Sequence, residues 1–449
     1  MNNDFFKIYK ALDAFETKEN LNLLNTKYGN IWPLLKIEVY KSYFKDYKKL
    51  KYRPMIWRIV GNFKRAVTSF YKSNKQLPPN NIFKETDELW VSSIGRRVNG
   101  YNKFTDPFFN EMSSSKSLMI ERSGDNPLFY SNVHVKSNSR ILNYESSYNF
   151  FNLLFIIKNT LSFSKVLKEV KIERVSNNYP SIQIFNLLVC YSYFVNWYNF
   201  YIYFFSKFTT LKRIYYTGNG TPDTYALNAA AHKLNIETIE FQHGVISKNG
   251  IDYKYRVLND NILKLVPSKI YVYSAEAREI LKNNTKGKVT IELIENFALT
   301  NWKNNESKLG TKTSILLTLQ NVIFPQDHFI YLFFKYINEK FPEMEIILRL
   351  HPSHQYVKVG FEEILEKLKI KFVWDNNAMI YDSLSNAILN ITAFSSTVED
   401  AINLKVPSWL ISNEGSMLYE QHIKTNPLVK SILTIEDASL TFNSIYNNY

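Results

Sequence analysis

The sequence predicts an α/β protein made of two Rossmann-like, doubly wound domains that face each other across a cleft. The chain has 449 residues, of which 45% are hydrophobic, so it is too long for one compact core. Short apolar strands alternate with helical segments in two successive series. Polar clusters follow several of these strands directly, where sheets of this kind bind their ligands.

The first series follows a mostly helical N-terminal segment of about 80 residues. Its last three elements form a strand–helix–strand unit, which implies a parallel sheet with helices on its faces. The expected elements are strands at 88–93 and 118–121, helical patterns at 147–170 and 182–207, a strand at 213–216, a helix at 222–235 and a strand at 238–241.

The second series begins near residue 265 and ends with a strand at 409–411. We therefore expect an N-terminal domain at 1–255 and a C-terminal domain at 256–449, whose last helix could pack back on the first domain. The expected elements are strands at 269–273, 288–293, 314–318, 345–350, 371–374, 387–390 and 409–411, with helices at 274–283, 325–340, 359–369 and 396–404.

The charge balance favours anionic partners. The chain carries 55 Lys and Arg residues against 41 Asp and Glu residues, for a net charge of +14. These basic residues are spread along the chain and accompany no nucleic-acid-binding motif, so no nucleic acid partner is expected. An acidic membrane surface or a phosphorylated substrate fits better.

The sequence also indicates the compartment. Cys190 is the only cysteine, which excludes an intrachain disulfide or a cysteine metal cluster and fits a reducing cytoplasm. The N-terminus lacks a secretion signal. The uncharged stretch 184–205 is long enough to span a bilayer, but it contains Asn186, Asn196 and Asn199, so a buried or interfacial helix is expected. The predicted location is cytoplasmic, with peripheral contact at the inner face of the membrane.

The first polar cluster is Gln242-His243-Gly244, after the strand that ends at Phe241. Gly244 permits a sharp turn or a positive φ. His243 would project into the cleft, where a histidine can act as general base on an acceptor hydroxyl. The alternative is that His243 only hydrogen-bonds the turn.

The second cluster runs from Arg349 to His354 and contains His351-Pro352. Pro352 stops the strand and holds His351 extended at its end. His351 and Arg349 could bind the phosphate of a nucleotide sugar and stabilise the charge of the leaving group. Because proline often follows a strand, this motif alone is weak.

The third cluster is Thr392 to Glu399, between a strand and a helix. Ser395, Ser396 and Thr397 offer hydroxyl and backbone donors for a phosphate, while Glu399 could reach a ribose hydroxyl. Ser396 with Glu399 three residues later also forms a capping-box pattern, which needs no ligand.

A weaker candidate is the turn Thr217 to Asp223. Gly218 lies in a glycine-containing strand-to-helix turn without the spacing of a dinucleotide fingerprint or P-loop. Thr221 followed by Pro222 is an ordinary N-cap arrangement. Asp223 is an alternative catalytic base.

Together, the His351-Pro352 pair and Ser395-Ser396-Thr397 resemble the donor motifs of bacterial CMP-sugar-using transferases of the GT-B fold, which include sialyl-, polysialyl- and Kdo transferases. The Phe-Gln-His-Gly strand end resembles capsular polysaccharide biosynthesis proteins. The resemblance covers about residues 210–415. It implies that His351, Ser395 and Ser396 or Thr397 contact the donor phosphate. It implies no metal, since no Asp-x-Asp motif is present, and no cofactor beyond the nucleotide-sugar co-substrate.

The resemblance implies a glycosyltransferase that moves a CMP-linked nonulosonic acid or Kdo to a surface-glycan or lipid-linked acceptor by direct displacement. UDP- and GDP-sugars are not excluded. The acidic motif that supplies the base in sialyltransferases is missing, which leaves His243, ahead of Asp223, as the expected base. The alternatives are a CDP-polyol phosphotransferase of the teichoic-acid type and a non-catalytic, membrane-peripheral capsule-assembly protein.

Overall fold

The computed structural model divides into two compact units, each described here by itself. Unit 1 comprises Asn3–Ile94 and Phe104–Ile294, and unit 2 comprises Gly95–Lys103 and Glu295–Tyr449. The structure describes residues 12, 14–16, 24–45, 80–93, 101–122, 141–143, 184–248, 250, 252–255, 258–305, 312–320, 324–351, 357–375 and 379–447. The expected helix at 147–170 and the residues Arg96, Arg97 and Pro352 to His354 lie outside these ranges.

Unit 1 is built on a seven-stranded sheet in the order β5-β4-β3-β6-β7-β8-β9, and every pair is parallel. The chain starts in the middle, winds outward to one edge and returns to the other side, as a doubly wound fold requires. Its strands are β3 (Glu88–Ser93), β4 (Ser117–Arg122), β5 (Ile141–Asn143), β6 (Arg213–Thr217), β7 (Glu237–Phe241), β8 (Lys269–Val272) and β9 (Thr290–Leu293).

The domain boundary lies further along the chain than the sequence suggested. Strands β8 and β9 pair with β7 and complete the first sheet, so unit 1 continues to Ile294 and does not end at 255. The strand–helix rhythm runs without interruption through this region, and rhythm alone does not reveal which sheet a strand joins.

The long uncharged helix of unit 1, α8 (Ile184–Phe205), packs along α9 (Pro222–Lys233) and α2 (Trp32–Lys45). Its Phe194, Phe204 and Phe205 are buried in the core of the unit, which fits the expectation of a buried helix. Within the part of the chain that the structure describes, no helix combines the length and the apolar character needed to cross a bilayer. The other helices are α4 (Asn80–Glu85), α5 (Asp106–Met112), α10 (Asp260–Leu263) and α11 (Ala275–Thr285).

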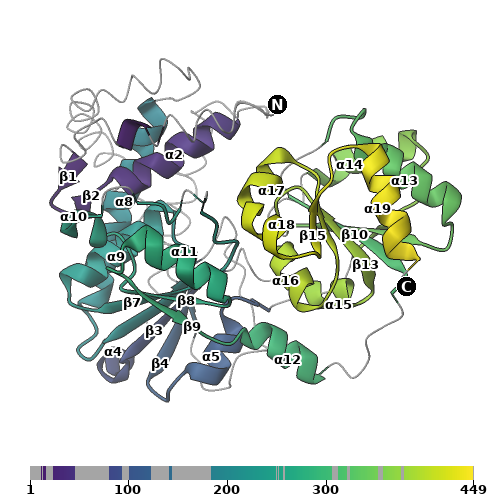
Figure 1. The fold of residues 1–449 in the computed structure, drawn as a ribbon. Helices are drawn as coiled ribbons and strands as arrows, with labels where there is room; N and C mark the ends of the chain where they lie inside the picture. The colour runs from purple at the N-terminus through teal and green to yellow at the C-terminus, as the bar shows by residue number, and fades with distance from the viewer. Residues whose placement is uncertain are drawn as a thin grey trace. The chain divides into compact units, whose positions relative to one another are not determined.

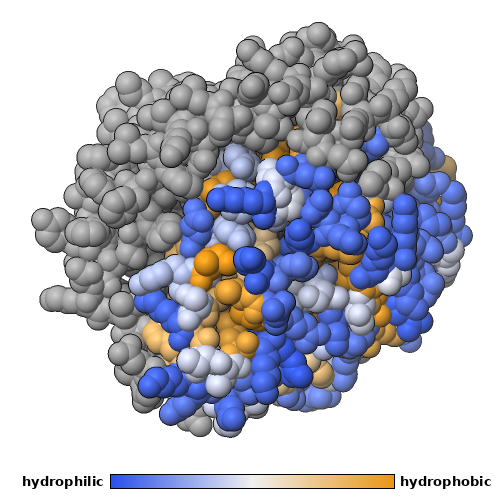
Figure 2. Space-filling model, turned by 90° about the vertical axis from the view of Figure 1, so that its left-hand side faces the viewer, coloured by the Kyte–Doolittle hydropathy of each residue, from blue (hydrophilic) through white to orange (hydrophobic). Residues whose placement is uncertain are grey.

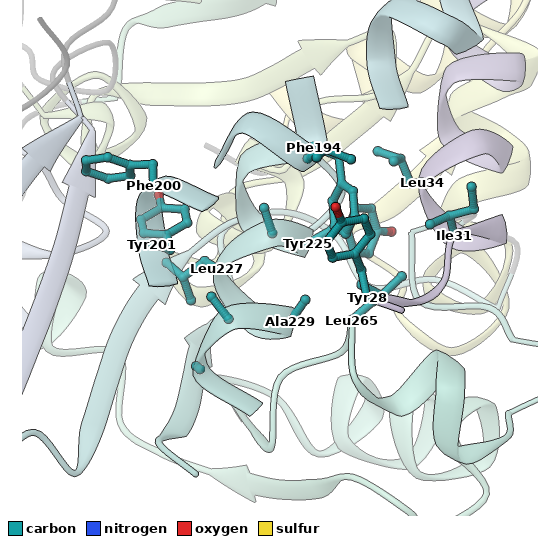
Figure 3. Close-up of a cluster of buried hydrophobic side chains, with 14 of the residues drawn as sticks. Tyr28, Ile31, Leu34, Phe194, Phe200, Tyr201, Tyr225, Leu227, Ala229 and Leu265 are labelled. Carbon is teal, nitrogen blue, oxygen red and sulfur yellow. The ribbon is translucent and has the colours of Figure 1, made fainter. Parts of the chain in front are cut away.

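The N-terminal segment is part of the core of unit 1. A short hairpin, β1 (Asn25–Thr26) with β2 (Gly29–Asn30), leads into α2. Figure 3 shows Tyr28, Ile31 and Leu34 of this segment beside Phe194 of α8 and Tyr225 of α9. The hairpin and α2 therefore contribute apolar area to the same core as the sheet-covering helices.

Unit 2 contains a six-stranded parallel sheet in the order β12-β11-β10-β13-β14-β15, which is the strand order of a Rossmann domain. The two expected Rossmann-like α/β domains are therefore confirmed. The strand at 409–411 was expected to be the last of the chain, but a further strand, β15, follows it and pairs with it. The strands are β10 (Ser314–Leu319), β11 (Glu345–Leu350), β12 (Val373–Trp374), β13 (Ala387–Thr392), β14 (Ser408–Leu410) and β15 (Val429–Ser431).

Helices flank both sides of the unit 2 sheet (Figure 1). The last helix, α19 (Ile435–Tyr446), packs on α13 of its own unit through Phe442 and Phe333, whose ring centroids are 5.6 Å apart. Its Ala438 and Phe442 belong to the core of unit 2. The remaining helices are α12 (Phe297–Asn305), α13 (Phe329–Lys340), α14 (Lys358–Lys367), α15 (Ile380–Ser385), α16 (Thr397–Asn403), α17 (Asn413–Leu418) and α18 (Glu420–Thr425).

Residues 101–103 are packed with unit 2, although they follow the first strand of unit 1. The ammonium of Lys103 lies 3.1 Å from Asp400 of α16 and 5.6 Å from the ring centroid of Tyr381.

On the face shown in Figure 2, most of the described surface is hydrophilic and hydrophobic colour is gathered in smaller patches.

We predict that His328 makes the stability of unit 2 depend on pH. Its Nδ1 accepts the amide hydrogen of Ile330 at the N-cap of α13, and burial lowers the pKa of His328 below its ordinary value. The unfolded chain therefore takes up the proton first, so stability is full above the unfolded pKa of about 6.5 and falls as pH drops below it. Melting temperatures between pH 7.5 and 5 should fall more steeply for the wild type than for His328→Asn, which keeps a cap that does not titrate. Parallel curves would contradict the prediction.

Candidate functional site

Each sheet reverses its winding direction at one pair of strands, and the candidate residues lie near these two points. In unit 1 the reversal lies between β3 and β6, and in unit 2 it lies between β10 and β13. Loops that leave adjacent strands on opposite faces diverge there, which leaves space for a ligand beyond the carboxyl ends of the strands. Thr217 to Asp223 follows β6, and Thr392 to Glu399 follows β13.

In unit 2, hydroxyl groups connect the ends of β10 and β13. Thr392 Oγ1 donates to the carbonyl oxygen of Thr318 at 3.1 Å, and the Thr318 and Thr397 hydroxyl oxygens are 2.9 Å apart. The amide of Ser395 donates to Thr392 Oγ1 at 3.1 Å. Thr318, Thr392 and Thr397 therefore hold the turn between β13 and α16 at the point of reversal.

The capping box expected for Ser396 and Glu399 does not form. Ser396 has helical dihedral angles and its side chain accepts no cap hydrogen bond. Instead, Ser395 Oγ accepts the amide hydrogen of Thr397 at 3.3 Å. The cap therefore lies one residue earlier, at Ser395, and the Thr397 hydroxyl is bonded to that of Thr318, 79 residues away in sequence. The Ser396 side chain is thus not used by the helix cap, and Glu399 is half-buried in the first turn of α16.

Arg349 and His351 lie at the end of β11, next to β10. Arg349 donates to Asp375 at 2.6 Å and to Ser383 at 3.2 Å, and the Asp375 side chain is 1% exposed. The ion pair joins β11 to the residue after β12 (Val373–Trp374), and the hydrogen bond to Ser383 joins β11 to α15. His351 is exposed, and its backbone amide donates to the carbonyl oxygen of Leu319 at 3.0 Å, so it lies beside the end of β10. His351 is therefore more accessible than Arg349, the other predicted phosphate ligand at this strand end.

The residues that flank α17 support the turn after β13 through hydrogen bonds. The buried Tyr419, which follows α17, donates its hydroxyl hydrogen to the carbonyl oxygen of Ser395 at 2.7 Å. Ser412, which precedes α17, donates to the carbonyl oxygen of Ala393 at 2.7 Å. Gly415 packs so closely that an added Cβ would lie 1.9 Å from the Ala393 carbonyl oxygen. The position of α17 therefore fixes the backbone of the candidate phosphate site.

We expect Gly415→Ala to destabilise unit 2 by about 3 kcal/mol, the upper end of the usual range for overpacking, because the new methyl group meets backbone atoms. Calorimetric melting would measure the loss. Gly244→Ala is the matched control: nothing lies within 4 Å of an added Cβ there, and its melting temperature should stay at the wild-type value. An unchanged melting temperature for Gly415→Ala would show that α17 moves at no cost.

In unit 1, His243 lies two residues beyond β7. Its ring is partly exposed, its Nδ1 atom is buried, and its centroid lies 6.4 Å from that of Phe104 in an edge-on arrangement. Gln242 accepts the amide hydrogen of Tyr273 at 3.0 Å and donates to the carbonyl oxygen of Gly244 at 3.0 Å. The turn is thus held mainly by Gln242. Gly244 is not among the described glycines with positive φ, so the sharp turn does not depend on its conformational freedom.

The turn after β6 lies beside this strand end. Gly218 and Gly220 have φ values of +82° and +101°, which favour glycine at both positions. Thr221 is the N-cap of α9 and its amide donates to the Thr224 hydroxyl at 3.2 Å, as the N-cap pattern predicted. Asp223 is half-buried in the first turn of α9.

A buried polar network that no sequence pattern indicates lies behind this turn. Glu240 of β7 is 0% exposed, and its Oε1 accepts the amide hydrogen of Asn219 at 2.7 Å and the hydroxyl of Tyr253 at 2.5 Å. Glu16 and Lys36 form a second buried pair, 2.6 Å apart. From the sequence alone, a charged residue in a strand or an N-terminal helix is expected to be exposed. The burial of these residues is explained only by their partners elsewhere in the chain.

The structure thus brings the predicted residues together in two sets. Gly218, Asp223 and His243 lie at neighbouring strand ends of unit 1, and His351 with Ser395 to Glu399 lie at the reversal point of unit 2. Among the residues that the structure describes, no three His, Cys, Asp or Glu side chains are placed to hold a metal ion.

No protein-family model matches the chain, and no curated protein matches it in sequence. Among solved structures, it is similar to a UDP-N-acetylglucosamine 2-epimerase from Listeria monocytogenes, with 11% identity over 81% of this chain and 88% of that chain and a TM-score of 0.49. The corresponding enzyme of Rickettsia bellii shares 13% identity over 81% and 88%, with a TM-score of 0.47. A UDP-glucose:anthocyanidin 3-O-glucosyltransferase in complex with UDP shares 9% over 81% and 90%, with a TM-score of 0.43. Likenesses at this level concern the fold and not the reaction.

Proposed function

We propose that the protein is a glycosyltransferase that uses a nucleotide-activated sugar to build a bacterial surface glycan. The observation that carries the proposal is the turn between β13 and α16. It lies at the reversal point of a Rossmann sheet, is fixed by the hydroxyls of Thr318, Thr392 and Thr397, and carries a Ser396 side chain that the helix cap does not use. A rigid turn with hydroxyl donors at this position suits the phosphate of a nucleotide.

Within this proposal, unit 2 binds the donor. Ser396 and His351 donate to the phosphate, and Glu399 binds the ribose. Ser395 and Thr397 hold the turn through their own hydrogen bonds and offer backbone amides. Arg349 is paired with Asp375, so its role is to add positive charge near the site and not to bind the phosphate directly. These groups stabilise the charge that develops on the leaving nucleotide, with no metal ion in the scheme.

Unit 1 supplies the catalytic base. His243 accepts the proton of the acceptor hydroxyl as the hydroxyl oxygen attacks the anomeric carbon, and the bond from that carbon to the nucleotide phosphate breaks. Because Nδ1 of His243 is buried, Nε2 is the nitrogen for this transfer. Asp223 is the second candidate base. The donor class that we favour is a CMP-linked nonulosonic acid or Kdo, and the acceptor is a glycan or a lipid-linked glycan at the inner face of the cytoplasmic membrane.

A nucleotide panel tests the donor site. Wild-type protein incubated with CMP, UDP, GDP and CDP-glycerol should show a raised melting temperature with one of them, and CMP is expected. His351→Ala should weaken that nucleotide about tenfold, the usual effect of losing a hydrogen bond to a charged group. His232→Ala, at the far end of α9 in unit 1, is the control and should keep full affinity.

The outcomes separate the alternatives. A shift with CDP-glycerol alone would favour polyol-phosphate transfer. Nucleotide binding without turnover of any nucleotide sugar would favour a non-catalytic capsule-assembly protein. No shift with any nucleotide would contradict all readings that place a donor in unit 2, and full affinity in His351→Ala would remove that residue from the site.

A further inference from the structure

Glu240 is a buried carboxylate that accepts hydrogen bonds from different parts of unit 1. Its side chain leaves β7 on the side opposite to Phe241, and it is fully buried. One oxygen, Oε1, accepts hydrogen bonds from the Asn219 amide and from the Tyr253 hydroxyl. Burial, followed by the Glu240 charge, raises the pKa of Tyr253 well above its ordinary value, so this hydroxyl stays protonated and donates.

The Asn219 bond ties the turn after β6 to β7. Asn219 stands between two glycines with positive φ, Gly218 and Gly220, which have no side chains to anchor the backbone. The space around Gly220 is filled on the other side, since an added Cβ would lie 3.2 Å from Asp252 and 3.3 Å from Ile37. The turn is therefore held between Glu240 and the segment that carries Asp252 and Tyr253.

Glu240 also links the two strand ends that carry the candidate bases. Three residues after it, beyond the end of β7, stands His243. Four residues after Asn219, in the first turn of α9, stands Asp223. A hydrogen bond that a backbone amide donates to a carboxylate is stronger than one that it donates to the neutral carbonyl of a glutamine side chain. Glu240 therefore holds these two strand ends in register more firmly than glutamine would.

We propose that Glu240 is a positioning residue for the acceptor side of the reaction: it fixes the Gly218–Gly220 turn relative to the end of β7 and so holds the general base in place. This inference rests on the proposed function, because it concerns the same site. It adds that the geometry of the acceptor side depends on a residue that does not touch the substrate.

The first measurement needs no substrate. Hydrogen–deuterium exchange of the Asn219 amide should be about five- to tenfold faster in Glu240→Gln than in the wild type, the effect of replacing a charge-assisted hydrogen bond by a neutral one. Tyr253→Phe, which removes the second donor and keeps the carboxylate, should change the same amide in the same direction. Tyr225→Phe is the matched control: it is a buried tyrosine of the same region whose hydroxyl has no hydrogen-bond partner among the described residues. In the Tyr225→Phe variant, the Asn219 amide should exchange at the wild-type rate.

The second measurement is turnover of CMP-N-acetylneuraminic acid, followed as released CMP. Glu240→Gln should lower kcat about tenfold to a hundredfold, because a small displacement of a catalytic group is costly, and leave the KM for the donor unchanged. A merely structural role would lower the melting temperature and the amount of folded enzyme without this separation of kcat from KM.

The two measurements fail independently. If Asn219 exchanges at the wild-type rate in Glu240→Gln, or if exchange rises while kcat stays unchanged, the positioning role is overturned. If wild-type protein binds and turns over no nucleotide sugar, the proposed function fails, while the exchange data still decide whether Glu240 fixes the turn. If Glu240→Gln does not fold, Tyr253→Phe decides: faster exchange with lower kcat supports the role, and no change in either contradicts it.

Discussion

Replacing His243 by alanine is expected to lower the rate of sugar transfer about 10²- to 10⁴-fold, the range observed when a general base is lost. The donor should bind as before, since the candidate phosphate ligands lie in unit 2. The side chain is partly exposed and its Nδ1 is buried, so Nε2 is the nitrogen to which we assign the proton transfer. Steady-state kinetics with the nucleotide sugar identified by the panel, together with nucleotide affinity, measure both parts of the prediction.

His232→Ala serves as the control for this experiment, because His232 lies in the last turn of α9, at the end of the helix opposite to Asp223. Its turnover should equal that of the wild type. Full turnover in His243→Ala would exclude His243 as base, and the same test would then apply to Asp223→Asn. A loss of nucleotide affinity in His243→Ala would show that the residue binds the donor and does not act as a base.

Breaking the Glu16–Lys36 ion pair from one side is expected to cost about 3–5 kcal/mol of the stability of unit 1, the usual effect of leaving a buried charge without its partner. The two side chains are 4% and 6% exposed and 2.6 Å apart. Glu16 also accepts the indole hydrogen of Trp32 at 2.8 Å, and Lys36 donates to the carbonyl oxygen of Lys254 at 2.6 Å. Glu16→Ala and Lys36→Ala, measured by calorimetry, should each show this loss.

A double replacement tests the explanation. Glu16→Leu with Lys36→Met should cost much less than the sum of the single changes, since no buried charge remains. Glu420 and Lys424 form the matched surface pair, with side chains 57% and 64% exposed, and breaking it should cost about 0.3–0.5 kcal/mol. Additive losses in the buried pair would show that the two charges are stabilised separately by Trp32 and Lys254.

Local pattern predicted the elements well where an apolar run is bounded by polar residues. β3 was expected at 88–93 and β11 at 345–350, and both have these bounds. β15 was missed because Val429-Lys430-Ser431 has three residues and no apolar run, and it is a strand only because β14 offers an edge to pair with. The assignment of β8 and β9 to the first sheet likewise depends on pairing, which strand–helix rhythm does not encode.

The candidate site shows the same division. Residues at strand ends, such as His243 and His351, could be found from their position after apolar runs. The buried residues that hold the neighbouring turns could not be found in this way. Glu240 reads as the polar member of an alternating strand, and its burial follows from Asn219 and Tyr253. The capping box at Ser396 was predicted from four consecutive positions, but Ser395 accepts the first-turn amide in its place, and the start of the helix is bonded to β10 through Thr397 and Thr318.

The winding order of unit 1 has a consequence for synthesis on the ribosome. β3 is the central strand, yet one of its two neighbours, β6, brings Arg213 beside Glu88 across 125 residues of chain. Lys36 meets its Lys254 partner across 218 residues. One edge of β3 and the ammonium of Lys36 must therefore wait for these partners while a further 125 and 218 residues, respectively, of the 449-residue chain are synthesised. In unit 2 the corresponding delay is shorter, because β10 meets its neighbour β13 across 72 residues, between Thr318 and Asn390. A nascent chain stalled before β6 would accordingly be the form most dependent on chaperones and most prone to aggregate.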